Sequence, residues 1–183
     1  MGGTITNNAL SPLVAFPAVA ACGPAYSSNS GISGTYSYNA NTGDLILSGI
    51  NNATLANGTY CFNNLTLTNI AQLKVDGPVV IKLTGALKIG QASRLSNTTE
   101  IPGNLRILSS FSGANGVTIN NGANNYMLVY APQTEINISG TGRLFGGAVG
   151  KSITVGNSGA IHYDTRLEAV WPEILSLILG PLP

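Results

Sequence analysis

The feature that most constrains this chain is a three-residue unit, apolar then polar then apolar, that keeps returning and is followed within a few positions by Gly or Asn. Because successive side chains of a strand point to opposite faces, each unit places two apolar groups on one face and one polar group on the other. Each unit therefore predicts a very short, half-buried strand. The units lie at residues 65–67, 73–75, 81–83, 87–89, 105–107, 117–119, 136–138, 153–155 and 161–163.

Strands this short cannot bury their apolar faces alone, so the chain must stack them as a β-solenoid or fold them into a sandwich or barrel. Two ladders of apolar residues, with steps of about 16 to 23 residues, favour a solenoid whose coils carry two or three strands. One ladder contains Leu87, Leu105, Leu128, Leu144 and Ile161, and the other contains Ile81, Ile101, Val117, Ile136 and Ile153. An antiparallel β-sandwich remains the alternative, because Asn-Gly or Asp-Gly pairs at 57–58, 76–77, 115–116 and 121–122 are also hairpin signals.

The pattern predicts a single domain over residues 1–183. We expect residues 1–43 to form an irregular N-terminal covering segment and residues 44–164 to form the β-helix. Residues 165–183 are expected to form a helical C-terminal cap, since Thr165 and Glu168 have the spacing of a capping box and an apolar run follows them. This run would cover an open solenoid end or, if exposed, make a contact between two copies of the chain.

The charge content argues against two classes of partner. Only 8% of the 183 residues are charged and the formal net charge is +1, so long-range attraction to nucleic acid has no strong source. No segment reaches the roughly 18 uninterrupted apolar residues that a membrane span requires. We therefore expect neither nucleic-acid binding nor a membrane span.

Cys22 and Cys61 have no neighbouring His or second Cys, so their spacing predicts no metal site. A disulfide between them would fit a secreted protein, and the alternative is a pair of buried free thiols. Neither cysteine has the histidine partner that a catalytic thiol requires, because the one histidine of the chain is His162.

Several longer stretches resemble uncharacterised bacterial β-helix domains of exported, cell-surface and pilus-associated proteins. The similarity extends over about residues 44–164 and is carried by the motifs at 58–62, 76–85, 130–132, 142–155 and 160–164. It implies a right-handed parallel β-helix of the pectin-lyase shape. It implies no catalytic residues, because these domains offer none to transfer.

The β-helix shape also hosts enzymes that cleave polysaccharides, which need two carboxylates close together or an acidic calcium site. The acidic residues are Asp44, Asp76, Glu100, Glu135, Asp164, Glu168 and Glu173, and no two lie one or two positions apart on a strand. His162 and Asp164 alternate on one strand and form a candidate polar pair, either as a base with its orienting group or as a structural pair at the start of the terminal helix.

Four cations, Lys74, Lys82, Lys88 and Arg106, occupy the outward middle positions of successive units. Stacked together they would offer a binding region for an acidic glycan or an anionic surface, although outward cations also keep strand edges soluble. We expect an exported, non-catalytic surface or matrix module without metal or cofactor, its targeting segment outside this chain. It would bind carbohydrate or another surface protein or act as a spacer. The alternatives are a polysaccharide-active enzyme and a self-assembling filament unit, with self-association through the apolar C-terminal segment.

Overall fold

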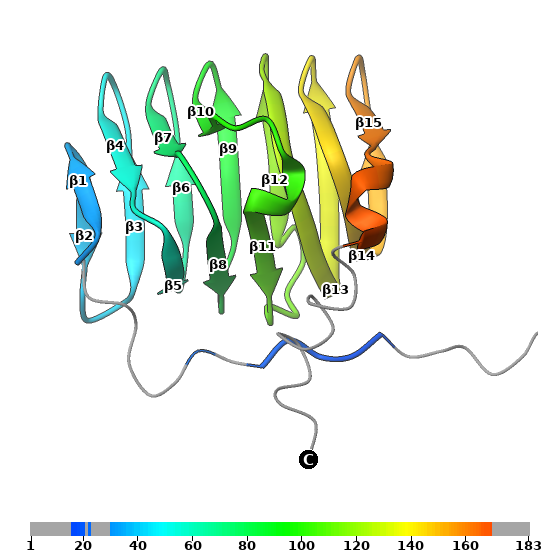
Figure 1. The fold of residues 1–183 in the computed structure, drawn as a ribbon, viewed down its shortest axis with the longest axis horizontal. Coiled ribbons are helices and arrows are strands. Elements are labelled where there is room, and N and C mark those ends of the chain that lie inside the picture. The colour runs from blue at the N-terminus through cyan, green and yellow to red at the C-terminus, as the bar shows by residue number, and fades with distance from the viewer. Residues whose placement is uncertain (1–15, 21, 23–29, 170–183) are drawn as a thin grey trace, which may run out of the picture.

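The computed structural model describes residues 16–20, 22 and 30–169. These residues wind into a parallel β-solenoid of about six turns, as the sequence pattern predicted. In Figure 1 the chain descends on the near side, rises on the far side and advances from left to right, so the coil is right-handed. The antiparallel sandwich is thereby excluded, because the strands of successive coils pair in parallel.

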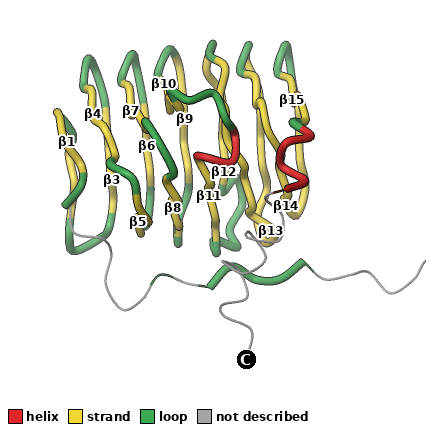
Figure 2. Tube along the Cα trace, viewed as in Figure 1, coloured by secondary structure: helices red, strands yellow, loops and turns green. Residues whose placement is uncertain are grey.

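The strands of each coil lie on three faces, which we call faces 1, 2 and 3 (Figure 2). Face 1 contains β1 (Ile32–Gly34), β4 (Asn52–Leu55), β7 (Gln72–Val75), β10 (Arg94–Asn97), the first parts of β13 (Asn124–Gly140) and β14 (Arg143–Val155), and β15 (Ala160–Tyr163). Face 2 contains β5 (Gly58–Phe62), β8 (Val79–Leu83), β11 (Leu105–Ser109) and the middle parts of β13 and β14. Face 3 contains β2 (Ser37–Asn39), β3 (Asp44–Leu47), β6 (Leu65–Leu67), β9 (Leu87–Gln91), β12 (Val117–Asn121) and the last parts of β13 and β14. Two short 3-10 helices, η1 (Pro102–Asn104) and η2 (Thr165–Ala169), complete the described elements.

The core is a set of apolar stacks that run along the solenoid axis. On face 3 one stack contains Leu45, Leu65, Leu87, Val117 and Ile136, each in register with the next and each fully buried. Complete burial of such a side chain contributes roughly 1.5–3 kcal/mol, so one stack stabilises several coils together. All nine predicted units lie within strands.

The predicted ladders are only partly correct. Val117, Ile136 and Ile153 do stack in register, and so do Leu144 and Ile161. The remaining members lie elsewhere, since Leu87 is on face 3, Leu105 is on face 2 and Ile101 lies exposed in the connection after β10. The cause is unequal coil length: the third coil contains long connections at residues 98–104 and 110–116, which shift every later repeat in the sequence.

The corner between faces 3 and 1 is formed by residues with positive φ that end or follow the face 3 strands. Gly49, Asn69 and Gln91 occupy this corner in the first three coils, with φ angles of 62°, 62° and 59°. The left-handed backbone region turns the chain sharply, and Gly and Asn adopt it at the lowest steric cost. The four pairs that were also hairpin signals, 57–58, 76–77, 115–116 and 121–122, likewise lie at connections between successive strands of the parallel coils and not in hairpins.

The N-terminal end of the solenoid is covered by described residues. β1 and β2 pair antiparallel to β4 and β3 of the first coil, and Tyr38 packs edge-on against Phe62 with ring centroids 6.1 Å apart. The part of the chain expected to be irregular therefore contains two short strands. Because β1 and β2 run antiparallel to the strands of the coils, the outermost strand edge at this end differs from the edge that a further parallel coil would need for pairing.

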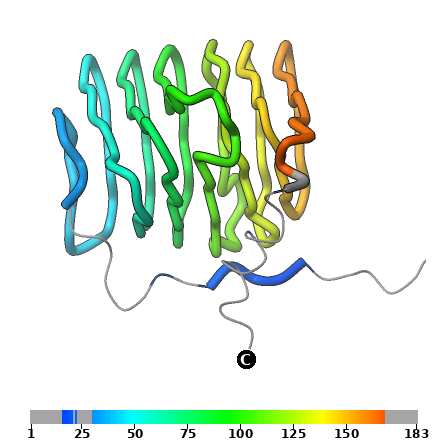
Figure 3. The backbone as a smooth tube through the Cα atoms, in the orientation of Figure 1, coloured from blue at the N-terminus to red at the C-terminus, as the bar shows by residue number. Residues whose placement is uncertain are grey.

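Unlike the N-terminal end, the C-terminal end of the solenoid exposes apolar residues of its last coil. In the last coil Ile153, Val155 and Tyr163 occupy inward positions but are 41%, 46% and 54% exposed. Of the predicted terminal cap, residues 165–169 form η2, and residues 170–183 lie outside the described part of the chain. The backbone trace in Figure 3 follows the successive coils from the covered end to this last one.

The helix η2 begins differently from the prediction. The capping side chain is Asp164 rather than Thr165, because its Oδ1 accepts a hydrogen bond from the backbone N–H of Arg166 at 3.0 Å. No helix among the described residues is long and apolar enough to cross a membrane.

Candidate functional site

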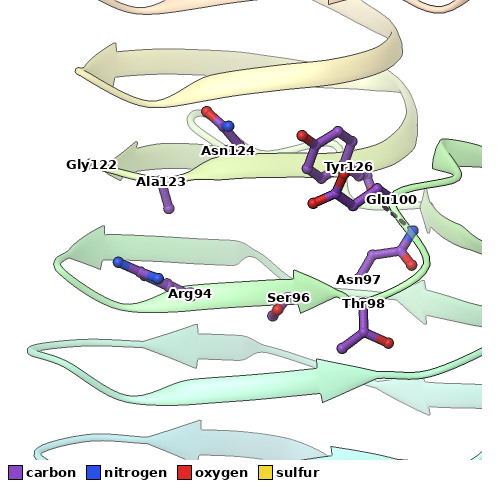
Figure 4. A pocket seen from close by; sticks show the side chains of 9 residues that line it. All are labelled: Arg94, Ser96, Asn97, Thr98, Glu100, Gly122, Ala123, Asn124 and Tyr126. Atoms are coloured by element: carbon purple, nitrogen blue, oxygen red, sulfur yellow. Dashed lines mark hydrogen bonds between the residues drawn. The ribbon is translucent and has the colours of Figure 1, made fainter.

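The candidate site is a groove on the outer side of face 1, between the third and fourth coils (Figure 4). Its volume is about 360 Å³, within the usual range of small-molecule sites of about 300–1,000 Å³. The lining is mostly polar and comes from β10, the connection that follows it and the first part of β13: Arg94, Ser96, Asn97, Thr98, Glu100, Gly122, Ala123, Asn124 and Tyr126.

The groove exists because the face 1 sheet is interrupted at this point. β10 is the last strand of a four-stranded sheet and pairs only with β7. The connection 98–104 after β10 is longer than the corresponding connections of the first two coils, and its first residues form one wall of the groove. The two coils are therefore held together here by side chains instead of a backbone ladder.

Asn97 provides this link. Its Nδ2 donates hydrogen bonds to the carbonyl oxygens of Ile101 at 2.8 Å and Tyr126 at 3.0 Å. Its Oδ1 accepts from the backbone N–H and the hydroxyl of Thr99 at 3.2 and 2.7 Å. Since Asn97 is buried, these bonds fix both the long connection and the start of β13, which position the groove walls.

Tyr126 supplies an aromatic surface. Its ring stacks on Phe145 of the next coil at 5.0 Å, and Phe145 stacks on His162 at 4.5 Å. The three rings therefore form an outward column along the axis, and Tyr126 is its last member on the groove side. Phe145 covers one face of the Tyr126 ring, and both the ring and the small side chain of Ser96 line the groove.

Two charged groups of opposite sign lie in the groove. Figure 4 shows Arg94 toward one end and Glu100 with Tyr126 toward the other. Within the described residues neither the guanidinium of Arg94 nor the carboxylate of Glu100 forms a hydrogen bond or ion pair, so both are available to a ligand. A site of this kind offers donors at one end and an acceptor at the other.

The four predicted cations do not gather in one region. Lys74 lies on face 1, next to Ser96 in register, whereas Lys88 lies on face 3 between Thr66 and Thr118. Lys82 and Arg106 lie on face 2 in neighbouring strands, and the Nε of Arg106 donates to the carbonyl of Gly103 at 2.9 Å. Successive units turn onto different faces of the solenoid, and for that reason outward positions that are adjacent in sequence separate in space.

His162 lies in β15 and Asp164 directly follows that strand, but the two side chains contact different partners. The exposed His162 stacks on Phe145, and Asp164 forms an ion pair with Arg166 in which the closest N–O distance is 2.6 Å. The Arg166 side chain, through hydrogen bonds and charge, lowers the pKa of Asp164 below its ordinary value. Asp164 thus caps the start of η2, which agrees with the part of the structural interpretation that places Asp164 at the helix start.

Three further carboxylates, those of Asp44, Asp76 and Glu135, accept hydrogen bonds from neighbouring parts of the solenoid. Asp44 accepts hydrogen bonds from Asn63, Asn64 and Thr42. Asp76 accepts from Thr98, and Glu135 accepts from the backbone of Asn115. Among the described residues no three His, Cys, Asp or Glu side chains gather in a way that would hold a metal ion.

Cys22 and Cys61 are joined in a disulfide on the outer side of face 2. We call residues 16–20 with Cys22 the strap. Val19 of the strap is 6% exposed and packs in an outer apolar cluster with Leu108, Leu128, Tyr130 and Leu167. The hydroxyl of Tyr130 donates to the carbonyl of Pro17 at 2.6 Å, and burial raises the pKa of Tyr130. The disulfide therefore fastens the strap over an apolar stripe that would otherwise face solvent.

Sequence reasoning did not single out Arg94, Tyr126 or Phe145, and it named Glu100 only as one acid among several. A signal did exist for the aromatic column: Tyr126, Phe145 and His162 are the outward residues of successive units on face 1. No sequence signal marks the groove itself, because it depends on a missing strand pairing.

Fold and site together define a β-solenoid with a polar, aromatic-lined groove on one wall. The family described as "Domain of unknown function (DUF7305)" matches residues 71–170, which is more than half of the chain, so the chain belongs to this family. No curated protein and no solved structure matches the chain.

Proposed function

We propose that this protein is an exported, non-catalytic module of the cell surface or extracellular matrix, acting as a rigid support that contacts carbohydrate. The observation that carries the proposal is the disulfide between Cys22 and Cys61. Disulfides that serve a structural role form and persist in oxidising compartments and are rare in the cytosol. This one fastens a strap over apolar surface, which is a structural role.

The architecture supports a binding or spacer role. Six stacked coils share one continuous core, so the walls are rigid and hold outward side chains at fixed spacing. Low charge suits this role, because the walls offer hydroxyls and amides that contact sugars or water rather than a strong electrostatic field. The described carboxylates outside the groove are engaged in structural hydrogen bonds, which favours binding over hydrolysis.

The proposal is tested by the location and the thiol state of the protein in its native cells. Free thiols are blocked before lysis, and the Cys22 and Cys61 peptides are then identified by mass spectrometry with and without reduction. We expect one cross-linked peptide pair and digestion of the intact-cell protein by added protease. Free Cys22 and Cys61 thiols in a protease-protected fraction would refute export.

A second candidate, a self-assembling unit, is favoured by the exposed apolar residues of the last coil, Ile153, Val155 and Tyr163. Assembly through this end predicts a molar mass that rises with concentration in light scattering. Val155→Asp should then restore the monomer, whereas Thr154→Asp, at the neighbouring outward position, should not. A concentration-independent monomer would exclude this candidate.

A further inference from the structure

The unused chemistry of the groove indicates a specific class of ligand. Four features meet there: an aromatic ring, a guanidinium, a carboxylate and several small hydroxyl and amide groups. The solenoid fold does not require a serine at position 96, since the first two coils carry Thr54 and Lys74 at the corresponding outward position. We propose that the groove binds a neutral pyranose unit of an oligosaccharide, with the sugar ring stacked on Tyr126. This rests on the proposed function and names its ligand.

The stacking platform follows from the aromatic column. Phe145 covers the Tyr126 ring from the side of the fifth coil at 5.0 Å, so the ring cannot collapse toward that coil. Ser96 of the third coil lines the same groove with a short side chain, which leaves the groove open between the two coils. The apolar C–H face of a pyranose fits against such a surface, and a ring already held by Phe145 loses little conformational freedom when it binds.

The charges select for hydroxyl groups. Sugar hydroxyls both donate and accept, so one hydroxyl can accept from Arg94 at one end of the groove and another can donate to Glu100 at the other. An acidic sugar would meet the carboxylate of Glu100, and a cationic ligand would meet the guanidinium of Arg94. Opposite charges that have no partner among the described residues therefore favour a neutral ligand that uses both.

The groove is built before the ligand arrives. Asn97 holds both of its walls through the carbonyl groups of Ile101 and Tyr126, and the buried amide has all of its polar atoms satisfied. A preformed site lowers the entropy cost of binding, and this matters for sugars because their individual contacts with a protein are weak.

The test is isothermal titration of the full chain with three probes: cellohexaose, chitohexaose and hexagalacturonate. We expect binding of at least one of the two neutral oligomers and none of the acidic one. Tyr126→Ala should weaken binding about tenfold, whereas Tyr126→Phe, which keeps the ring, should change it by less than about twofold. Ser96→Trp should abolish binding by filling the groove, and it keeps the test valid if Tyr126→Ala unfolds.

Matched controls lie on other surfaces: Tyr163→Ala removes an exposed ring at the solenoid end, and Thr118→Ala removes a hydroxyl on face 3. Both should bind as the wild type does. Binding of hexagalacturonate alone, binding that survives Ser96→Trp, or no binding of any probe would overturn the proposal. Each of these results leaves the thiol and location assay unaffected, so failure of the groove and failure of the exported role are distinguishable.

Discussion

At the scale of single residues, buried asparagine side chains hold the solenoid together where its backbone ladder is interrupted. Asn121 and Asn125 exchange reciprocal hydrogen bonds at 3.1 and 3.2 Å and so fasten the corner of the fourth coil. Asn97 replaces a missing backbone ladder, and among the described residues no buried side-chain polar atom lacks a partner. Buried polar groups that are fully satisfied specify one arrangement, because any shift would leave them unpaired at high cost.

Asn97→Leu is expected to lower the free energy of unfolding by about 1–3 kcal/mol, since the carbonyls of Ile101 and Tyr126 lose the donor that satisfies them. Urea unfolding followed by circular dichroism measures the loss. The control is Asn124→Leu, at an exposed position of the same groove, which should change stability by less than about 0.5 kcal/mol. Equal effects at the two positions would contradict the bridging role of Asn97.

The titration of Asp44 gives the protein a dependence on acid pH. Burial raises the pKa of Asp44, but hydrogen bonds from Thr42, Asn64 and Asn63 together outweigh it and lower the pKa below its ordinary value of 3.8. A pKa that is lower in the folded state stabilises the fold above the unfolded-state value, and this contribution is lost as the pH falls through the folded-state value. The urea midpoint should therefore fall below about pH 4.

Asp44→Asn should show a smaller fall in urea midpoint between pH 6 and pH 2 than the wild type, because the substituted amide does not titrate. The comparison uses the same buffer series and ionic strength for both proteins. Identical slopes for wild type and variant over this range would show that Asp44 does not contribute to the pH dependence.

At the scale of elements, close contacts between neighbouring strands set which residues each coil tolerates. Gly146 of β14 has a φ of 142°, and a Cβ at this position would meet the carbonyl oxygen of Met127 and the ring of Pro102. Gly146→Ala is expected to cost about 1–3 kcal/mol, since both the backbone angle and the contact are unfavourable. Thermal unfolding measures the difference. Gly156→Ala is the control, because nothing lies within 4 Å of the added Cβ there, and a loss of equal size would refute the contact argument.

The elements also show how far sequence reasoning reaches. The alternation of units such as 65–67 and 117–119 predicted strands correctly, because side-chain direction depends only on local backbone geometry. The placement of Leu105 beside Leu87 failed, because the loops of the third coil alter the register and loop length is not encoded in the units. The groove was out of reach for the same reason: Arg94 and Tyr126 are separated in sequence by a full coil, and their proximity depends on the interrupted ladder.

At the scale of the whole molecule, each coil contacts only its neighbours, so the free energy of unfolding is approximately a sum of terms for single coils and for the interfaces between adjacent coils. β1 and β2 cover the first coil, and the strap with its disulfide fastens face 2. Within the described residues, the last coil has a neighbour on one side only, and its inward residues are exposed. Local opening should therefore begin at the C-terminal coil and advance toward the N-terminus.

Ile136 and Ile153 allow this gradient to be measured, because they occupy the same inward position of face 3 in consecutive coils, fully buried in one and 41% exposed in the other. Ile136→Ala should cost about 2–5 kcal/mol, as is usual for a buried aliphatic side chain, whereas Ile153→Ala should cost less than half as much. Chemical denaturation gives both values. Hydrogen exchange should show faster exchange of the amides of residues 153–155 than of residues 136–138. Equal losses at the two positions, with equal protection of both segments, would mean that the last coil is as deeply covered in solution as the one before it, and the solenoid would then have no open end from which to unfold.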